Sequence, residues 1–394
     1  MNKKTIRDIN LKKKRVLVRV DYNVSLLPDF KIGDDLRIKQ SLQTINYLFE
    51  QNCTIFLVCH LGRPGGRVNL KYSLAPVRLD LQRLLGKKVS LIKNYIDGPG
   101  REAAQKAKPA TINLLENIRF YPEETANDLE FAWKLANLAE VFVFDAFGTA
   151  HRIHASTVGV TKYLPSVAGL LLEKEINILN QAIKKPKRPF VVIIGGAKTR
   201  TKIPLIKSLI GKADILLIDG GVGNTFLRAK GYAMGKSLID EGMLKIANKI
   251  IKQARSSKTQ IILAEDLVIG SLKKGSYKGA VLASKIPSDL EALDIGPKTE
   301  VKFGQIIAQA KTIIWNGPMG VFELPEFARG TNFIYQAIAA NRDSLSIIGG
   351  GETLTALPKE EYLETIDHIS TGGGAMLEFI EKGTLPAIEA LEEK

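Results

Sequence analysis

Nine short apolar runs, most of them rich in β-branched residues, alternate with helical stretches along the 394-residue chain. Each run has the length of a buried strand and carries almost no charge, which is the pattern of a parallel sheet covered by helices on both faces. The runs begin at residues 15, 53, 111, 141, 189, 213, 259, 311 and 343. We therefore predict an α/β protein built from doubly wound, Rossmann-like parallel sheets.

An amphipathic segment separates the first four runs from the last five. Its apolar residues recur at helical spacing from Leu172 to Ile183, and Pro186 follows. The predicted parts are a first domain of residues 1–170, a connecting helix and hinge of residues 171–188, and a second domain of residues 189–380. The last residues, 381–394, are expected to form a helix, capped by Thr384, that docks back onto the first domain.

The net charge of +15 is concentrated in the first part of the chain. Residues 1–170 hold 26 Lys and Arg against 16 Asp and Glu. This excess favours a polyanionic partner, which could be nucleic acid, a membrane surface or a small phosphorylated substrate. Charge alone does not choose among them.

In the first domain, basic and small polar residues follow the apolar runs. The carboxyl ends of parallel strands meet at one sheet edge, where ligands bind in open α/β sheets. Guanidinium groups match the geometry of phosphate and carboxylate, so we expect an anion site on this edge. The residues that carry this prediction are Arg19, Asp21, Asn23, His60, Leu61, Gly62, Arg63, Arg119, Thr149, His151, Arg152 and His154.

In the second domain, glycine clusters follow the runs instead. A strand that ends in glycines before a helix exposes backbone N–H groups to a phosphate. Four such clusters, at residues 195–196, 220–223, 349–351 and 372–374, indicate a nucleotide site. Lys198 and Lys202 are expected on one face of a helix beside the first cluster.

Two well-known phosphate motifs are missing from the sequence. GGAKTRTK lacks the spacing of a Walker P-loop, and no G-x-G-x-x-G follows the first run. The residues alone therefore indicate an anion domain and a nucleotide domain joined by a hinge. This is the layout of an enzyme that transfers a phosphoryl group between ATP and a small phosphorylated acid.

Motifs along the whole chain resemble those of phosphoglycerate kinases. They include VLVRVDYNV, HLGRP, LLENIRFYPEE, DAFGTAHRIHAS, IIWNGPMGVFE, GGGET and HISTGGGA, in the family's order. The resemblance implies a glycolytic phosphotransferase with a carboxyl group as acceptor. It would exchange a phosphoryl group between 1,3-bisphosphoglycerate and ADP, giving 3-phosphoglycerate and ATP with Mg²⁺, by hinge closure.

The resemblance also implies the ligands of each domain. For the acid substrate it implies Asp21, Asn23, Arg37, His60, Leu61, Gly62, Arg63, Arg119 and Arg152. For the nucleotide it implies Lys198, Lys202, Gly296, Asn316, Glu323, Gly350, Gly351, Glu352 and Thr353, with Glu323 on the ribose and Glu352 on the metal. The catalytic groups would be Arg37, Lys202, Gly373 and Gly374, since cations and N–H donors stabilise the charge on a transferring phosphoryl group.

Two residues depart from the family's pattern. Glu352 stands where the family usually has Asp, which leaves the geometry at the metal open. Asp219 stands where the family commonly has Gly and would bring a negative charge close to the nucleotide.

Two other functions stay open at this point. The positive charge is compatible with a nucleic-acid-binding protein, although no recognised module or interleaving of basic and aromatic residues is present. Glu352 and Asp219 are compatible with a nucleotide-binding protein that has lost catalysis. We expect a monomer with small-molecule substrates, without a membrane partner and without nucleic acid as its main partner.

The expected location is the cytoplasm. No apolar run is long enough to span a membrane or to serve as a signal-peptide core. The two cysteines, Cys53 and Cys59, lie in one predicted strand and are too far apart to bridge, which is typical of reduced intracellular proteins.

Overall fold

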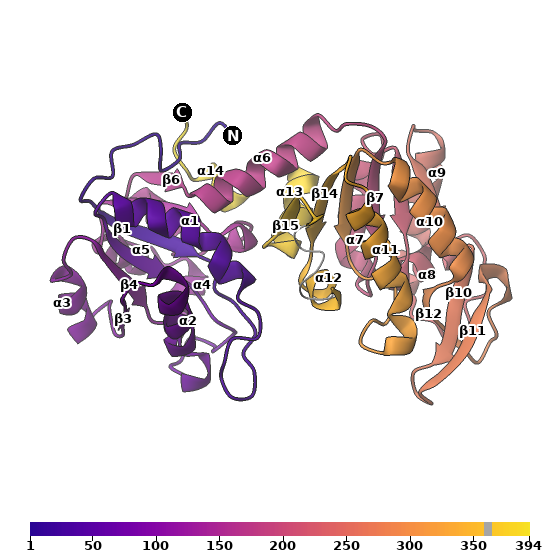
Figure 1. Ribbon diagram of the computed structural model, residues 1–394, viewed down its shortest axis with the longest axis horizontal. Helices are drawn as coiled ribbons and strands as arrows, with labels where there is room; N and C mark the ends of the chain where they lie inside the picture. The colour runs from indigo at the N-terminus through magenta and orange to yellow at the C-terminus, as the bar shows by residue number, and fades with distance from the viewer. Residues whose placement is uncertain (358–364) are drawn as a thin grey trace. The chain divides into compact units, whose positions relative to one another are not determined.

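The computed structural model describes residues 1–357 and 365–394, which form two compact units (Figure 1). Unit 1 comprises Met1–Asn177 together with Thr384–Lys394, and unit 2 comprises Ile178–Gly383. The change from one unit to the other falls inside α6 (Leu170–Lys184), which occupies the place of the predicted connecting helix.

Unit 1 is built on a parallel six-stranded sheet with the order β3-β4-β2-β1-β5-β6. Its strands are β1 (Arg15–Val20), β2 (Thr54–Val58), β3 (Val89–Ile92), β4 (Thr111–Leu115), β5 (Val141–Asp145) and β6 (Ser166–Ala168). Strand β1 lies inside the sheet, and its residues from Val16 to Val20 are all buried. Burial on both faces of a strand requires helices on both sides of the sheet, as the mostly apolar run predicted.

The helices of unit 1 begin and end at recognisable signals. Asp128 caps the helix Leu129–Ala136 by accepting a hydrogen bond from the Phe131 N–H at 2.8 Å. Gly86 ends the helix Ala75–Leu85 with a left-handed φ of 61°. The α-helices are α1 (Leu36–Glu50), α2 (Ala75–Leu85), α3 (Pro99–Gln105), α4 (Pro122–Ala126), α5 (Leu129–Ala136) and, near the C-terminus, α14 (Pro386–Glu389). Short 3₁₀ turns are η1 (Leu70–Tyr72), η2 (Ile118–Phe120), η3 (Phe147–Thr149) and η4 (Gly159–Lys162).

Unit 2 is built on a second parallel six-stranded sheet, with the order β15-β14-β13-β7-β8-β9. Its strands are β7 (Phe190–Ile194), β8 (Ile215–Ile218), β9 (Gln260–Leu263), β13 (Thr312–Asn316), β14 (Leu345–Gly349) and β15 (His368–Ser370). Its helices are α7 (Thr199–Leu209), α8 (Gly220–Ala229), α9 (Leu244–Arg255), α10 (Pro297–Gln309), α11 (Arg329–Ala340), α12 (Gly351–Ala356) and α13 (Gly373–Lys382), with 3₁₀ turns η5 (Glu241–Met243), η6 (Ala283–Lys285) and η7 (Pro325–Phe327). The two sheets confirm the predicted α/β fold class.

A small antiparallel sheet in unit 2 was not predicted. Its order is β11-β10-β12, with β10 (Asp266–Ser271), β11 (Ser276–Leu282) and β12 (Glu291–Ile295). Strand β11 is largely exposed, and the apolar stretch of β10 is only three residues long, so these segments lack the longer apolar runs that marked the other strands. Both pairings of β10 contain a register shift. The three-residue strands β6 and β15 are too short to show a periodicity.

The C-terminal segment packs on unit 1. Leu385, Ile388 and Leu391 are buried, and the Ala387 N–H donates to the carbonyl of Ala150 at 3.0 Å. Helix α14 begins after Leu385, whose side chain cannot cap it, so the prediction that Thr384 caps this helix is wrong. Among the described residues, no helix is long and apolar enough to cross a membrane.

Because each unit contains one of the two tryptophans, their stabilities can be measured separately. Trp133 lies in α5 of unit 1 and Trp315 in β13 of unit 2. We expect Leu391→Ala to destabilise unit 1 by about 2–5 kcal/mol, because it leaves a cavity under the C-terminal segment. Urea unfolding should shift to lower concentration when followed by Trp133 in a Trp315→Phe background. An unchanged Trp133 transition would show that the segment does not stabilise unit 1.

Candidate active site

The predicted anion site is assembled at the carboxyl edge of the unit 1 sheet. Asp21 and Asn23 follow β1, and the segment from His60 to Arg63 follows β2. Arg119 lies in η2, Arg152 follows η3, and Arg37 lies in the first turn of α1. Parallel pairing of β1 with β2 and with β5 is what gathers these segments, which are far apart in the sequence.

A chain of hydrogen bonds connects α1 to the loops after β1 and β2. The Arg37 guanidinium lies 3.2 Å from the Asp21 carboxylate and donates to the Asn23 carbonyl at 3.0 Å. The Asn23 side-chain oxygen accepts from the Gly62 N–H at 2.8 Å. Arg119 donates to the Gly62 carbonyl at 2.8 Å, so both backbone groups of this glycine are used.

Gly62 and Leu61 hold the β2 loop in place. Gly62 has a φ of 61°, and a Cβ there would lie 2.3 Å from the Tyr72 ring, so only glycine fits. The buried Leu61 contributes its backbone, which exchanges two hydrogen bonds with the side-chain amide of Asn117 at 3.3 and 2.8 Å. Asn117 thus holds the loop through its side chain, and it was not among the predicted residues although it stands inside the LLENIRFYPEE motif.

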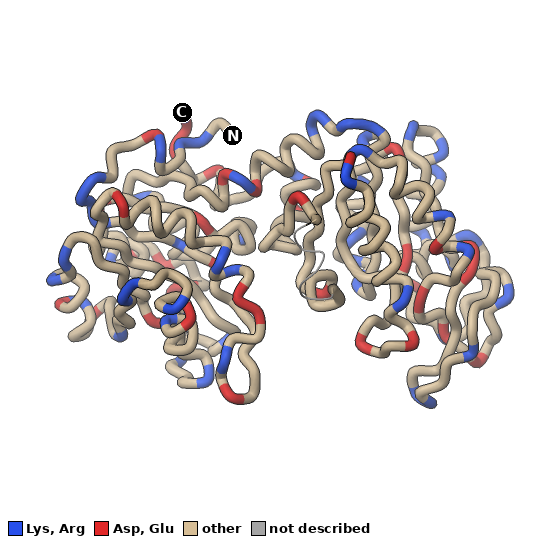
Figure 2. The backbone as a smooth tube through the Cα atoms, viewed as in Figure 1, with Lys and Arg blue, Asp and Glu red and all other residues tan. Residues whose placement is uncertain are grey.

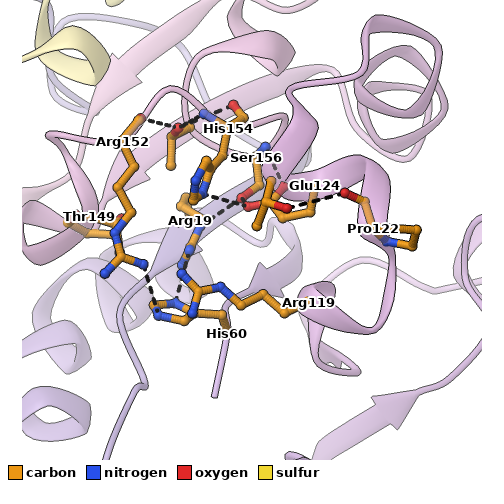
Figure 3. Close-up of polar contacts among 12 residues, drawn as sticks. Arg19, His60, Arg119, Pro122, Glu124, Thr149, Arg152, His154 and Ser156 are labelled. Atoms are coloured by element: carbon orange, nitrogen blue, oxygen red, sulfur yellow. Dashed lines mark hydrogen bonds and ion pairs between the residues drawn. The ribbon is translucent and has the colours of Figure 1, made fainter. Parts of the chain in front are cut away.

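His60 is buried and lies between two guanidinium groups (Figure 3). Arg19 is 3.3 Å from its Nδ1 and Arg152 is 3.5 Å from its Nε2. Burial, together with Arg19, Arg119, Arg152 and Arg37, keeps the pKa of His60 well below its ordinary value. The ring is therefore neutral at physiological pH.

The arginines of this site differ from most other basic residues of the chain in how deeply they are buried. Figure 2 shows Lys and Arg throughout both units. Burial and the neighbouring guanidinium groups of Arg152, Arg19 and Arg63 lower the pKa of Arg119 to about 10. The pKa of Arg152 is lowered in the same direction, first by burial and then by Arg19, Arg63 and Arg37, against Asp21. Positive groups held this close repel one another, so the site is prepared for an anion.

In unit 2, a pocket of about 330 Å³ lies at the carboxyl ends of β7 and β8. Gly196, Gly220 and Gly221 form one side of it. The apolar side chains of Leu267, Leu293, Met319 and Val321 line it, and Glu323 and Glu352 belong to its lining. Apolar walls with a few polar groups suit a flat base and its sugar.

Beside the pocket, Lys202 is held by a buried side-chain network. Its ammonium group donates to the Asn316 side-chain oxygen, and the Asn316 amide donates to the Gly349 carbonyl at 2.6 Å. Lys202 is 9% exposed, and burial lowers its pKa to about 8, against Glu352, which raises it. Asn316 therefore fixes the ammonium at the end of β13.

The helix N-termini of α12 and α13 come together next to this network. Gly350 has a φ of 116°, and its neighbour Thr353 accepts from the Gly317 N–H at 2.7 Å. A Cβ on Gly373 would lie 2.5 Å from the Gly350 Cα. At Gly351 and Gly374, a Cβ would have no other atom within 4 Å, so the backbone there is open to a ligand.

Three predicted residues of unit 2 lie in surroundings that differ from those expected. Helix α7 begins at Thr199, so Lys198 precedes the helix, and its exposed ammonium group lies 2.8 Å from Glu352. Gly296 is the N-cap residue of α10 and packs so closely on Asp266 that a Cβ would lie 2.3 Å from the Asp266 side chain. It is not part of the pocket lining. Asp219 lines the pocket, but burial raises its pKa well above the ordinary value and disfavours the negative charge expected there.

Comparison with known proteins decides the family. The family model described as phosphoglycerate kinase matches residues 6–383. The chain is 48% identical over 396 residues to the phosphoglycerate kinase of Moorella thermoacetica and 46% identical over 395 residues to that of Pelotomaculum thermopropionicum, with 100% of each chain covered. The chain belongs to the phosphoglycerate kinase family.

Solved structures of phosphoglycerate kinases share the fold. The enzyme from Coxiella burnetii matches with a TM-score of 0.87 at 38% identity, and that from Pyrococcus horikoshii OT3 matches with 0.86 at 33% identity. In each comparison 98% of both chains is covered. The chain is therefore a glycolytic phosphotransferase with a carboxyl acceptor, which exchanges a phosphoryl group between 1,3-bisphosphoglycerate and ADP.

The close contact of Gly373 with Gly350 gives a test of the helix N-termini. We expect Gly373→Ala to lower kcat/KM by about 100-fold, the loss that a displacement of about 1 Å causes at an active site. Gly374→Ala is the matched variant, because its Cβ enters open space and its N–H remains. Steady-state kinetics with MgATP and 3-phosphoglycerate should give a much smaller loss for Gly374→Ala. Equal effects of the two substitutions would contradict this packing argument.

Proposed function

We propose that unit 1 binds 3-phosphoglycerate or 1,3-bisphosphoglycerate and that unit 2 binds ADP or ATP. The observation that carries this proposal is the cluster of partly buried arginines around the neutral His60. An anionic acid would relieve the repulsion within this cluster and accept hydrogen bonds from it. The proposed acid ligands are Asp21, Asn23, Arg37, His60, Leu61, Gly62, Arg63, Arg119 and Arg152.

On the nucleotide side, the base would enter the apolar pocket and Glu323 would accept hydrogen bonds from the ribose hydroxyls. Lys198, Lys202 and the backbone from Gly350 to Thr353 would bind the phosphates. Asn316 would position Lys202, and Gly296 would act through the packing of α10 and Asp266.

In the ATP-consuming direction, a carboxylate oxygen of 3-phosphoglycerate attacks the γ-phosphorus of ATP, and the bond from that phosphorus to the β-phosphate oxygen breaks. The electron pair of that bond leaves with ADP. The carboxylate is already ionised near pH 7, so no general base is required. Arg37, Lys202 and the N–H groups of Gly373 and Gly374 would stabilise the charge on the transferring group.

We propose that Glu352 holds the Mg²⁺ that the nucleotide carries. Magnesium is commonly bound by one or two carboxylates together with substrate phosphates. Glu352 fits this role because its half-exposed carboxylate belongs to the lining of the pocket, and binding of the metal would replace its ion pair with Lys198. No group of three metal-binding side chains occurs in residues 1–357 and 365–394, so the nucleotide phosphates would supply further ligands. When bound, the metal would neutralise charge on the phosphates.

The proposed ligand sites belong to different units, so the two substrates must be brought together for transfer. We propose that this movement occurs at residues 171–188, which contain most of α6 and the segment before β7. Closure of this kind excludes water that would otherwise hydrolyse the acyl phosphate.

We also propose a cytoplasmic monomer that works on small molecules without a membrane or nucleic-acid partner. The glycolytic reaction supports the location, and so do Cys53 and Cys59, which are both buried free thiols.

Arg37 is the residue on which the reaction can be tested most directly. Purified protein should form ATP from 1,3-bisphosphoglycerate and ADP only when Mg²⁺ is present. We expect Arg37→Ala to lower kcat by about 10²–10³, the usual effect of removing one group that stabilises a developing charge. Lys39→Ala is the matched control, because Lys39 is an exposed cation on the same helix and pairs with Asp35. MgADP binding without turnover in the unmodified protein would instead support a nucleotide-binding protein that has lost catalysis.

Lys202 predicts a pH dependence of nucleotide binding. Its pKa of about 8 means that the free protein loses the ammonium proton as the pH rises through that value. A bound phosphate favours the charged form, so binding should take up a proton at about pH 9, and affinity should fall as the pH rises above 8. Titration calorimetry in buffers of different ionisation enthalpy measures this uptake.

Lys202→Arg provides the control for this measurement. A guanidinium keeps its proton throughout this range, so the uptake should disappear. Uptake that persists in Lys202→Arg would assign the proton to another group, such as Asp294, whose pKa burial raises to about 7.

A further inference from the structure

Behind His60, away from Arg152, lies a buried polar chain that the reaction scheme does not use (Figure 3). It consists of Arg19 in β1, Ser156 in the segment between η3 and η4, and Glu124 in α4. All three residues are at most 1% exposed. Burying an arginine and a glutamate costs free energy unless their hydrogen bonds are made, so the arrangement requires a physical explanation.

The hydrogen bonds of this chain run in one direction only. The Arg19 Nε–H donates to the Ser156 hydroxyl oxygen at 2.9 Å, and that hydroxyl donates to Glu124 Oε1 at 2.6 Å. The Ser156 N–H donates to the second carboxylate oxygen at 2.9 Å. Arginine cannot accept a hydrogen bond and a carboxylate cannot donate one, so the proton positions between them are determined.

At its other end, this chain reaches the ring of His60. Arg19 donates from its Nη2 to Nδ1 of His60 at 3.3 Å, and from its Nη1 to the carbonyl of Val20. An Nδ1–H on His60 would oppose the Arg19 N–H inside the protein, and both donors would be left without an acceptor. Nε2 faces the Arg152 guanidinium at 3.5 Å, so a ring proton on either nitrogen opposes one arginine. The contact with Arg19 is the shorter one and is fully buried, whereas the contact with Arg152 is only partly buried, so the ring proton is assigned to Nε2. An anion that accepts hydrogen bonds from the His60 Nε2–H and from the Arg152 guanidinium satisfies both of these groups.

We propose that Glu124 is a positioning residue of the acid-substrate site, which holds His60 as the Nε2–H tautomer through Ser156 and Arg19. The proposal rests on the proposed function, in which His60 binds the acid substrate. Glu124 acts without touching that substrate.

The location of Glu124 also explains how a buried arginine is neutralised without weakening the site. Glu124 lies on the opposite side of Arg19 from His60, with Ser156 between them, and its carboxylate is 3.7 Å from His154 Nδ1. Glu124 thus compensates the charge of Arg19 from the side that faces away from His60. Among the residues the structure describes, Arg119 and Arg152 form no ion pair within 4 Å, so their guanidinium groups remain available to an anion.

Nuclear magnetic resonance of ¹⁵N-histidine-labelled full-length protein tests the proposal, since long-range ¹H–¹⁵N correlations distinguish the two tautomers. The chain has four histidines, and a His60→Asn variant identifies the signals of His60. In the unmodified protein we expect His60 to be a single Nε2–H tautomer from pH 6 to 8, a range that starts close to the ordinary histidine pKa. Addition of 3-phosphoglycerate should shift its Nε2 signal.

Ser156→Ala should break the chain, and Glu124→Gln should remove its charge while keeping an oxygen acceptor. We expect Ser156→Ala to mix the tautomers and to raise the KM for 3-phosphoglycerate by about tenfold, as for a lost hydrogen bond to a charged group. The KM for MgATP should stay unchanged. Glu124→Gln should also mix the tautomers and raise the KM for 3-phosphoglycerate, by a smaller factor. Because it preserves the shape of the side chain, it still tests the proposal if Ser156→Ala does not fold.

Ser166→Ala is the matched control, because Ser166 is a buried hydroxyl of unit 1 that donates only to the Leu164 carbonyl. A purely structural role would lower the stability of all three variants without changing the tautomer or separating the two KM values. An unchanged His60 tautomer and KM in both Ser156→Ala and Glu124→Gln would overturn the proposal. If the Nε2 signal of His60 in the unmodified protein does not shift when 3-phosphoglycerate is added, the proposed substrate site is overturned instead.

Discussion

The pairing of β1 with both β2 and β5 is the constraint on which the anion site depends. In this register Arg19 lies beside Val58 and Val20 beside Asp145, so the residues that follow each strand reach the same sheet edge. Parallel strands place their carboxyl ends together, and the side chains between them must be buried. Arg19 is buried for this reason, and its charge then requires the partners that Ser156 and Glu124 provide.

In the proposed function, the two units bind phosphate groups by different physical means. Unit 1 uses guanidinium groups, whose mutual repulsion favours an anion and whose fixed donors match its oxygens. Unit 2 relies mainly on exposed backbone, where Gly350 and Gly373 approach each other too closely for a side chain. Lys202 adds one charge, which Asn316 holds at a buried position. A nucleotide has several phosphates along an extended chain, and helix N-termini can contact them without a cluster of opposing charges.

The departures from the family's pattern lie in unit 2 and leave Lys198 and Lys202 in place. Glu352 carries its carboxylate beside Lys198, at the edge of the pocket. Asp219 caps α8 by accepting from the Gly220 N–H at 2.6 Å, and burial disfavours its charged form. Each departure therefore changes the surroundings of the proposed phosphate site in unit 2 and leaves Lys202 in place.

Much of this protein could be predicted from its sequence. The nine apolar runs all became strands, because burial on both faces of a parallel sheet favours runs that are mostly apolar and carry little charge. The motifs identified the family. The short strands and the antiparallel sheet of β10, β11 and β12 left no comparable signal. The functions of Ser156 and Glu124 were equally hidden, since a buried serine and a buried glutamate look like surface residues in a sequence. Only the tertiary structure brought them to Arg19, because hydrogen bonds depend on distances between segments that the chain order does not contain.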